Sequence, residues 1–377
     1  MSKIQVLLIS PYHGGSHRSW AEGLRRYSGL EMDALTLPAR FWKWRMHGGA
    51  VTLARRFVER KLSPQVLLMT DMLDVTTFLA LTRPFTTHLP VALYMHENQL
   101  TYPLPGDGRS NPTQQPKGER DLHYAFINLV SMLAADRVLF NSQYHLESVI
   151  AELPKFLRHF PDYNKLNAIA RLRYKSEVLP VGIDFQRLAY RPQTLDDAAS
   201  PLIVWNQRWE YDKNPGDFFR ALFVLADEGV SFRLALCGEQ FGERASIFDE
   251  AITRLGERIV HVGYAEPGRY RQLLWEAAVT VSTAHHEFFG ISVLEAIYCH
   301  TFPILPHRLS YPELIPQPYH LRCLYQNSGG LLERLRWALA HRDEAQKIAR
   351  ELATAVSIYD WPRLAPRYDD VLLKLAG

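Results

Sequence analysis

The segment AHHEFFGISVLEA, residues 284–296, decides the fold that we predict for the second half of the chain. It follows AAVTVST (277–283), a short β-branched run typical of a buried parallel strand. Gly290 precedes an apolar run, which indicates a strand, a glycine-containing turn and then a helix. Because the N-terminus of a helix carries free N–H groups and a partial positive charge, this turn suits a phosphate or the hydroxyls of a sugar.

Two glutamates in this segment are spaced to face such a ligand. Glu287 lies in the expected loop, and Glu295 lies slightly further along the expected helix. Taken alone, this spacing favours an ordinary amphipathic helix with two solvated glutamates. The remainder of the chain reverses that interpretation.

Composition and length are those of a globular protein with more than one domain. The chain has 377 residues, of which 47% are hydrophobic and 22% charged, and this length predicts two to three domains. No apolar run is long enough for a transmembrane helix, and we expect the short apolar run near the N-terminus to be a strand and not a signal peptide. The scattered cysteines, Cys237, Cys299 and Cys323, lack metal-ligand spacing, so we expect a reducing cytoplasm.

Charge is distributed unevenly along the chain. Residues 1–180 contain a surplus of lysine and arginine, whereas the remaining residues contain a surplus of aspartate and glutamate. A basic first half suggests a polyanionic partner, although a surplus of this size is equally typical of ordinary surface variation.

The N-terminal residues have the pattern of a doubly wound domain. Residues 4–10 predict a first strand, PYHGGSH (11–17) a turn, and residues 18–27 an amphipathic helix. In such domains ligands bind at the carboxyl ends of the strands. Two glycines there permit a close approach of the backbone to a ligand, and two histidines add polar contacts: Gly14, Gly15, His13 and His17. A tight turn without a ligand is the simpler explanation of the glycine pair.

Cations alternate with large aromatic side chains in LPARFWKWR (37–45). Such a pattern suits stacking on bases and contact with phosphates. The alternative is a loop whose tryptophans fill the edge of a core. The residues that we assign to RNA contact on this basis are Arg40, Trp42, Lys43, Trp44 and Arg45.

Further buried strands that end in polar residues are predicted within PQVLLMTDM (64–72), VALYMHENQL (91–100) and residues 136–142. VALYMHENQL (91–100) ends in His96, Glu97, Asn98 and Gln99, and the strand at 136–142 ends in Ser142. The carboxyl ends of parallel strands are where an α/β site is built. Residues 103–120 are rich in proline, glycine and polar residues, and we interpret them as a mobile lid over this region.

A second α/β set follows a linker at residues 189–201. Its strands are predicted within 201–206, 232–241, 258–264, 277–283 and 301–306. The predicted fold class is therefore α/β, with two doubly wound domains facing a cleft. Arg208 and Lys213 follow the first strand of the second set and suit a diphosphate. The alternative is a surface loop in which Glu210 and Asp212 are their local partners.

These motifs together resemble a known family. The R-x4-K and E-x7-E patterns, the glycine pair and the PVGID turn (180–184) are similar to those of the retaining GT-B glycosyltransferases of family 4. The match narrows to the tRNA-queuosine α-mannosyltransferase family and covers nearly the whole chain. The motifs that carry it are GGSH (14–17), LPARFWKWR (37–45), HENQLTYP (96–103), FNSQYHLES (140–148), RWEYDKNP (208–215) and HEFFGISVLEAIYC (286–299).

The resemblance implies an organisation into two Rossmann-like domains. Residues 1–184 would bind the acceptor, with residues 361–377 packing back on them, and residues 185–360 would bind the nucleotide sugar. The implied donor is GDP-mannose, and the implied acceptor is the cyclopentenediol of queuosine in the anticodon loop of tRNA, that for aspartate in particular.

The resemblance also implies roles for individual residues. Arg208 and Lys213 would bind the diphosphate and stabilise the leaving group, Glu295 would hold the ribose, and Glu287 would lie by the donor sugar. Gly15 would let the first domain approach the diphosphate, and His96 would reach the sugar near its 6-hydroxyl or the acceptor. The backbone that would contact sugar hydroxyls and phosphate is that of Phe289, Gly290 and Ile291.

The chemistry expected of this set is metal-independent transfer with retention of configuration. Two cations and a helix N-terminus would stabilise the departing diphosphate, and no D-x-D pair follows a predicted strand. A runner-up interpretation is a family 4 enzyme acting on a lipid-linked or polysaccharide acceptor, docked on a membrane through the basic residues at 55–61. A rival of another class is a catalytically silent RNA-binding protein, which the presence of all four charged site residues disfavours. The oligomeric state stays open.

Overall fold

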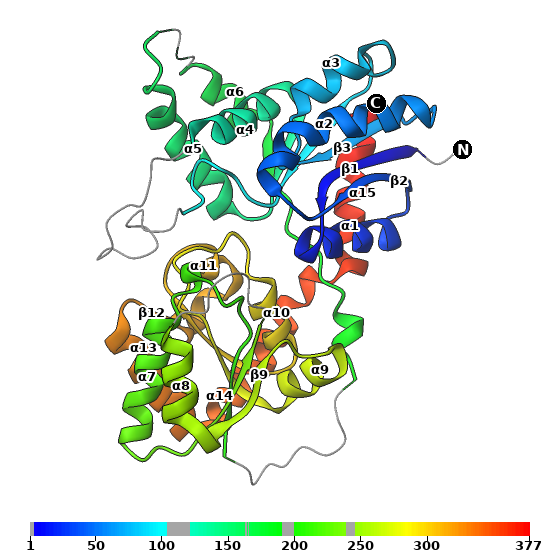
Figure 1. Cartoon of the computed structure of the whole chain (residues 1–377). Helices are drawn as coiled ribbons and strands as arrows, with labels where there is room; N and C mark the ends of the chain where they lie inside the picture. Colours follow the sequence, from blue (N-terminus) through cyan, green and yellow to red (C-terminus); the bar gives the residue numbers. More distant parts are fainter. Residues whose placement is uncertain (1–3, 104–120, 163, 165, 191–199, 239–245) are drawn as a thin grey trace. The chain divides into compact units, whose positions relative to one another are not determined.

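The computed structural model describes residues 4–103, 121–162, 164, 166–190, 200–238 and 246–377, which form two compact units (Figure 1). The first unit consists of residues up to Ile183 together with a second, C-terminal segment, Tyr359–Gly377. The second unit runs from Asp184 to Ile358. Nearly all of the predicted lid at 103–120, and most of the linker at 189–201, lie outside the described residues.

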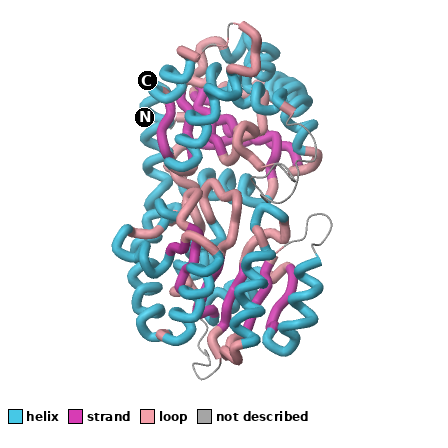
Figure 2. The backbone as a smooth tube through the Cα atoms, turned by 90° about the vertical axis from the view of Figure 1, so that its left-hand side faces the viewer, coloured by secondary structure: helices cyan, strands magenta, loops and turns pink. Residues whose placement is uncertain are grey.

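The first unit is built on a six-stranded parallel sheet in the order β2-β1-β3-β4-β5-β6. Its strands are β1 (Gln5–His13), β2 (Glu31–Pro38), β3 (Val66–Thr70), β4 (Val91–Met95), β5 (Arg137–Phe140) and β6 (Ser176–Val178). Its helices are α1 (Gly15–Tyr27), α2 (Trp42–Glu59), α3 (Val75–Thr86), α4 (Leu122–Ala134), α5 (Gln143–Leu157), α6 (Ala168–Tyr174) and α15 (Trp361–Ala376). Every residue of β3 and β4 is buried, as expected of apolar strands with helices on both faces (Figure 2).

The start of the chain differs from the sequence-based prediction. Strand β1 continues through the predicted turn as far as His13, and helix α1 begins at Gly15 instead of at residue 18. The reason is β2, which was not predicted and which pairs with β1 from Gln5 to His13. Only Leu35 and Leu37 of β2 are buried, because it lies at the edge of the sheet, and its apolar pattern is correspondingly weak.

The last helix of the chain, α15, completes the first unit. Asp360 pairs with Ile183 in an isolated bridge, and the Trp361 N–H donates to the Ile183 carbonyl over 3.0 Å. The indole of Trp361 fills space that two glycines leave open. A Cβ on Gly23 would lie 2.0 Å from this indole, and a Cβ on Gly182 would lie 2.3 Å from it. These two positions therefore require glycine.

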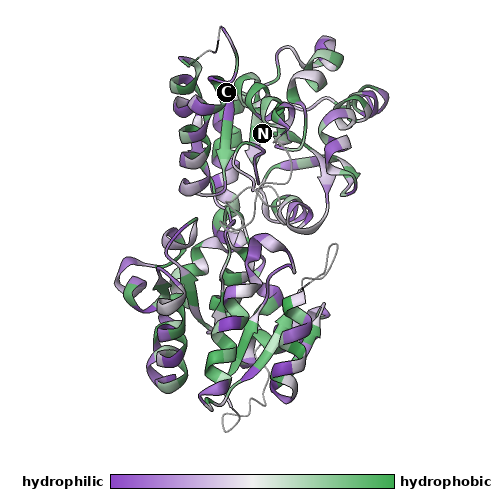
Figure 3. Ribbon diagram, turned by 60° about the vertical axis from the view of Figure 1, so that its left-hand side comes forward, coloured by the Kyte–Doolittle hydropathy of each residue, from purple (hydrophilic) through white to green (hydrophobic). Residues whose placement is uncertain are grey.

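The second unit contains a second six-stranded parallel sheet, in the order β12-β11-β10-β7-β8-β9. Its strands are apolar, and the helices around them are amphipathic (Figure 3). The strands are β7 (Leu202–Trp205), β8 (Arg233–Cys237), β9 (Ile259–Gly263), β10 (Ala277–Val281), β11 (Phe302–Pro306) and β12 (Leu324–Tyr325), the last of which was not predicted. The helices are α7 (Pro215–Asp227), α8 (Ser246–Leu255), α9 (Pro267–Glu276), α10 (Ile291–Tyr298), α11 (Tyr311–Leu314), α12 (His320–Cys323), α13 (Ser328–Ala340) and α14 (Arg342–Val356).

Candidate active site

A buried lysine is the centre of the polar site in the second unit. Lys213 ends a short 3-10 turn, Tyr211–Lys213, that follows β7, and its side chain is buried. Its Nζ donates to the His286 carbonyl over 2.9 Å and to the Glu287 carboxylate over 3.2 Å. Asp212 lies 3.4 Å from the same Nζ. The segment after β7 thus supplies the cation, and the loop after β10 supplies its carboxylate partner.

The charges of this cluster support one another. Burial opposes a charge on Lys213, but Glu287 and Asp212 outweigh this effect and raise the pKa of Lys213. Burial likewise opposes a charge on Glu287, but Lys213 and His286 lower the pKa of this carboxyl below its usual value. Both members of the pair are therefore charged at neutral pH.

Arg208 is more exposed than Lys213. Its Nη1 lies 3.2 Å from Glu210, and about half of its side chain is accessible. This local partner is the one that the surface-loop alternative named. Asp212 is likewise a local partner of Lys213, as that alternative named it, but both residues are buried and do not lie on the surface.

The turn before α10 has the predicted form. Gly290 is the N-cap of α10 and has a φ of 106°, a conformation that favours glycine. The Phe289 N–H donates to Glu287 Oε1 over 3.4 Å, and Ser310 Oγ donates to the Phe289 carbonyl over 3.0 Å. Ile291 is the first residue of the helix. The structure therefore brings Lys213 and Glu287 to the N-terminus of α10.

Glu295 is held by side chains that sequence reasoning missed. It is buried on α10, its Oε1 accepts a hydrogen bond from Arg187, and its Oε2 accepts one over 2.8 Å from the Tyr270 hydroxyl. Asn206 donates to Tyr270 in turn, over 3.1 Å. These partners are far from Glu295 in sequence, and no local pattern marks them.

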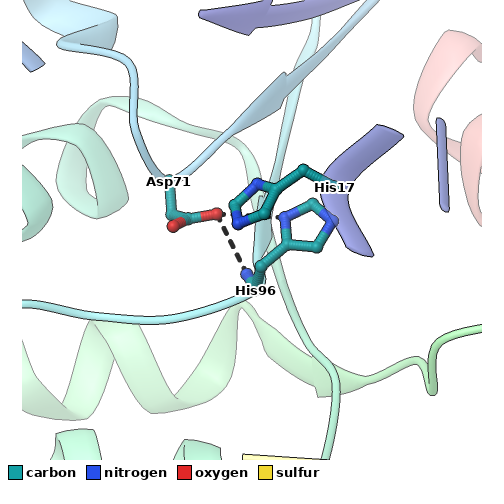
Figure 4. A group of neighbouring side chains, drawn as sticks. All are labelled: His17, Asp71 and His96. Carbon is teal, nitrogen blue, oxygen red and sulfur yellow. Dashed lines mark hydrogen bonds and ion pairs between the residues drawn. The ribbon is translucent and has the colours of Figure 1, made fainter. Parts of the chain in front are cut away.

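A second polar cluster lies in the first unit, at the carboxyl ends of β3 and β4 (Figure 4). Asp71 follows β3 and His96 follows β4, and His17 reaches them from α1. Asp71 Oδ1 accepts from the His96 backbone N–H over 3.0 Å and lies 3.1 Å from His96 Nδ1. The rings of His17 and His96 stack with their centroids 4.1 Å apart. Asp71 was not singled out, although a polar residue directly after a buried strand was a usable signal.

The other predicted residues of this region have mainly local partners. Asn98 Oδ1 accepts from the N–H groups of Leu100 and Thr101, which closes the turn after His96. The Gln99 side chain donates to Glu97, Ser142 is the N-cap of α5, and His13 lies near Glu22. Gly14 packs on Ala39, whereas Gly15 has a φ of 51° and open space where a Cβ would lie.

The predicted RNA-contact residues lie at the start of α2, and the structure separates their roles. Trp42 packs on Tyr124 with the rings 5.1 Å apart, as the core-edge alternative requires. Trp44 is 63% exposed, and Lys43 lies over the Trp42 ring. Arg45 Nε donates to the Pro38 carbonyl over 3.1 Å, and Arg40 is exposed.

Comparison with known proteins tests the predicted membership of the tRNA-queuosine α-mannosyltransferase family. Residues 5–183 match the family model described as tRNA-queuosine alpha-mannosyltransferase N-terminal, and residues 186–353 match glycosyl transferases group 1. A tRNA-queuosine alpha-mannosyltransferase of Drosophila melanogaster is 32% identical over 345 residues, which cover 89% of this chain and 86% of that protein. The chain belongs to the tRNA-queuosine alpha-mannosyltransferase family. It is therefore a glycosyltransferase, as the motifs predicted.

Solved structures bear out the GT-B fold of this family member. Sucrose-phosphate synthase of Thermosynechococcus elongatus superposes with a TM-score of 0.72 at 15% identity, over 99% of each chain. The catalytic domain of starch synthase IV of Arabidopsis thaliana, bound to ADP and acarbose, gives a TM-score of 0.73 at 12% identity over the full length of both. At these identities the likeness concerns the fold. Among the described residues, no helix has the length and hydropathy needed to cross a membrane.

Proposed function

We propose that this glycosyltransferase moves mannose, with retention of configuration, from GDP-mannose to the cyclopentenediol of queuosine in the anticodon loop of tRNA, that for aspartate in particular. The name of the Drosophila relative supports the sugar class and the acceptor. The observation that carries the proposal is the ion pair between the buried Lys213 and the partly buried Glu287 at the N-terminus of α10. Such a site suits a leaving group that gains negative charge.

The proposed roles follow the charge that develops during transfer. Breaking the bond from sugar to diphosphate leaves negative charge on the β-phosphate and positive charge on the anomeric carbon. Lys213, Arg208 and the N–H groups of α10 would stabilise the phosphate, and Glu287 would orient the sugar or stabilise its carbon. Because protein cations supply the positive charge, we expect transfer without a metal ion.

The acceptor would enter as a splayed loop of RNA. Its hydroxyl would attack from the face that the diphosphate leaves, and a phosphate oxygen would take its proton. The exposed Trp44, with Arg40 and Lys43, offers a stacking surface and positive charge for a single-stranded loop. Binding to phosphates predicts that tRNA affinity falls steeply with salt. We also expect the enzyme to work in the cytoplasm on soluble tRNA, without stable membrane association.

The decisive experiment is transfer of radiolabelled mannose from GDP-mannose to tRNA with and without queuosine, in the presence and absence of a chelator. Incorporation only into queuosine-containing tRNA, unaffected by the chelator, is the expected result. Transfer from a different sugar nucleotide would overturn the donor and keep the acceptor. A lack of transfer to tRNA from every donor tested would favour the lipid-linked or polysaccharide acceptor.

The RNA surface has its own test. Trp44→Ala should weaken tRNA binding and leave thermal stability unchanged, because the side chain is mostly exposed. Tyr174→Ala is the matched control, since Tyr174 is an aromatic residue that is 86% exposed on α6 of the same unit. Equal tRNA affinity of the Trp44 variant and the intact protein would contradict the assignment.

A further inference from the structure

His96 has one side-chain nitrogen that the protein leaves unused. Its side chain is only 6% exposed, and its Nε2 is buried without a hydrogen-bond partner among the described residues. Buried polar atoms are almost always paired, so an orphaned acceptor or donor at the carboxyl edge of a sheet needs an explanation. A ligand that supplies the missing hydrogen bond is the simplest one.

The orientation of the His96 ring is fixed from several sides. His17 stacks on the ring at 4.1 Å with an interplanar angle of 26°. Trp20 and Tyr94 each meet it edge to face at 4.7 Å. Asp71 then anchors the edge that carries Nδ1 (Figure 4). A ring held in this way is preorganised, and it loses little entropy when a ligand binds.

Asp71 also decides which nitrogen carries the proton. Its Oδ1 accepts from the His96 backbone N–H and lies 3.1 Å from the imidazole Nδ1. Burial raises the pKa of Asp71, but the surrounding backbone N–H groups favour the ionised carboxylate, which can only accept a hydrogen bond from Nδ1. Burial lowers the pKa of His96 to about 3, and burial lowers that of His17 to about 3 as well. His96 is therefore neutral at pH 7, and an ionised Asp71 would hold its single proton on Nδ1.

We propose that Asp71 is a positioning residue that holds His96 in the Nδ1–H tautomer, so that Nε2 accepts a hydrogen bond from a hydroxyl of the bound sugar or of the acceptor diol. The choice of ligand rests on the proposed function. The proposed tautomer does not rest on it, because the tautomer depends only on groups of the protein itself, Asp71 and His96. A neutral acceptor favours hydroxyl-bearing ligands over analogues in which that hydroxyl is missing, since the latter leave Nε2 unpaired.

A metal ion is a poorer explanation of the same cluster. His17, Asp71 and His96 each place one possible ligand atom within 4.8 Å of the others. However, the rings of His17 and His96 are stacked, so the lone pairs of their nitrogens lie in two separate planes and cannot both point at one ion. In addition, His96 Nδ1 already lies at hydrogen-bond distance from Asp71. Binding of an ion by all three residues would require the rings to separate.

The first test is the tautomer itself, read from the ¹⁵N shifts of the imidazole nitrogens in full-length protein labelled with ¹⁵N-histidine, without ligand at pH 7. The His96→Gln variant assigns the signals. We expect Nδ1 of His96 to be protonated and Nε2 to be unprotonated. A proton on Nε2 in the intact protein would overturn the proposal, whether or not the enzyme acts on tRNA.

The second test compares Asp71→Ala with Asp74→Ala, its matched control three residues further on. Asp74 is the N-cap of α3 and lies outside the cluster, so its loss affects stability only. Without Asp71 we expect His96 to shift toward the Nε2–H form and kcat for transfer to fall about tenfold or more. The control should keep both properties. An unchanged tautomer in the Asp71 variant would contradict the proposal.

A double-mutant cycle separates positioning from a general loss of structure. If Asp71 acts through His96, then Asp71→Ala should lower kcat little further in a His96→Gln background. Independent, additive losses would show that Asp71 acts by another route. A complete absence of transfer in the intact protein, together with the expected tautomer, would refute the proposed function and leave the role of Asp71 standing.

Discussion

At the scale of single residues, the Lys213–Glu287 pair explains how a buried cation is tolerated before any ligand arrives. A buried lysine without a partner would lose its proton or destabilise the fold. Here Glu287 lies 3.2 Å away, and Asp212 adds a second negative charge at 3.4 Å. Glu287 neutralises Lys213 in the free enzyme, and under the proposed function it would also face the sugar in the complex.

The Glu287→Gln substitution tests these functions. The amide keeps the shape of the side chain and removes its charge, so we expect nearly intact affinity for GDP-mannose and a fall in turnover of about 100-fold or more. The measurements are donor binding by calorimetry and turnover with queuosine-containing tRNA. Glu333→Gln, an exposed site on α13, is the control and should retain full activity. Unchanged turnover in the Glu287 variant would end its catalytic assignment.

The acid stability of the second unit depends on His286. Burial lowers the pKa of His286 to about 4, with a further contribution from Lys213, whereas the unfolded residue titrates near 6.5. The unfolded state therefore binds the extra proton, and stability is full above pH 6.5 and falls as the pH drops toward 4. The expected loss is up to about 1.4 kcal/mol per pH unit in that range.

Thermal unfolding at pH 7 and pH 5 measures this effect. The fall in melting temperature between the two pH values should be smaller in His286→Gln than in the intact protein. His341→Gln, which removes an exposed histidine of the same unit, should leave the fall unchanged. A fall of equal size in all three proteins would assign the acid sensitivity to other groups.

At the scale of elements, the turn before α10 depends on the backbone of Gly290. Any Cβ there would be strained by the φ of 106° and would lie 3.1 Å from Leu314 Cδ1. We expect Gly290→Ala to cost about 2 kcal/mol, combining backbone strain with lost packing, and to weaken donor binding. Gly229→Ala provides the comparison, because Gly229 has a φ of 74° with nothing within 4 Å. Equal melting temperatures for the two variants would show that packing at Gly290 adds nothing.

The elements that the sequence could predict are those whose apolar runs are buried on both faces. β3, β4, β7 and β10 are of this kind, and the turn at Gly290 was marked by its glycine. Of the edge strands, β9 was predicted from its apolar run, whereas β2 was missed because only Leu35 and Leu37 of its 8 residues are buried, and β12 because it has only 2 residues.

In the candidate site, too, the residues that could be predicted are those that follow clearly apolar strands. Lys213 and Glu287 follow strands that are clear in the sequence, so their convergence at one sheet edge could be anticipated. The partners of Glu295 could not be anticipated, because Arg187 and Tyr270 lie 108 and 25 residues away in sequence and reach Glu295 only through tertiary packing. Asp71 was accessible to the same argument as His96, since each directly follows a buried strand.

At the scale of the whole molecule, the chain closes its first unit with its last helix. α15 buries Trp361, Leu364, Tyr368 and Leu372 in that unit. The Tyr368 hydroxyl accepts from Trp20 Nε1 over 2.9 Å and donates to the Pro180 carbonyl over 2.7 Å. The first unit thus combines residues 4–183 with residues 359–377, and α15 covers Trp20 and Tyr94, whose rings lie against that of Tyr368.

Truncation after Ile358 should therefore unfold the first unit selectively. Loss of several fully buried large side chains costs about 3–5 kcal/mol each, which is comparable to the entire stability of a domain. In limited proteolysis followed by mass spectrometry, residues 4–183 should become sensitive while the second unit stays protected. A chain ending at Leu372 is the matched control, because residues 373 and 374 are exposed and the last buried side chain is retained. If the first unit of the shorter chain resisted proteolysis as well as that of the control, α15 would be an attachment and not part of the core, and the glycines at 23 and 182 would need another explanation.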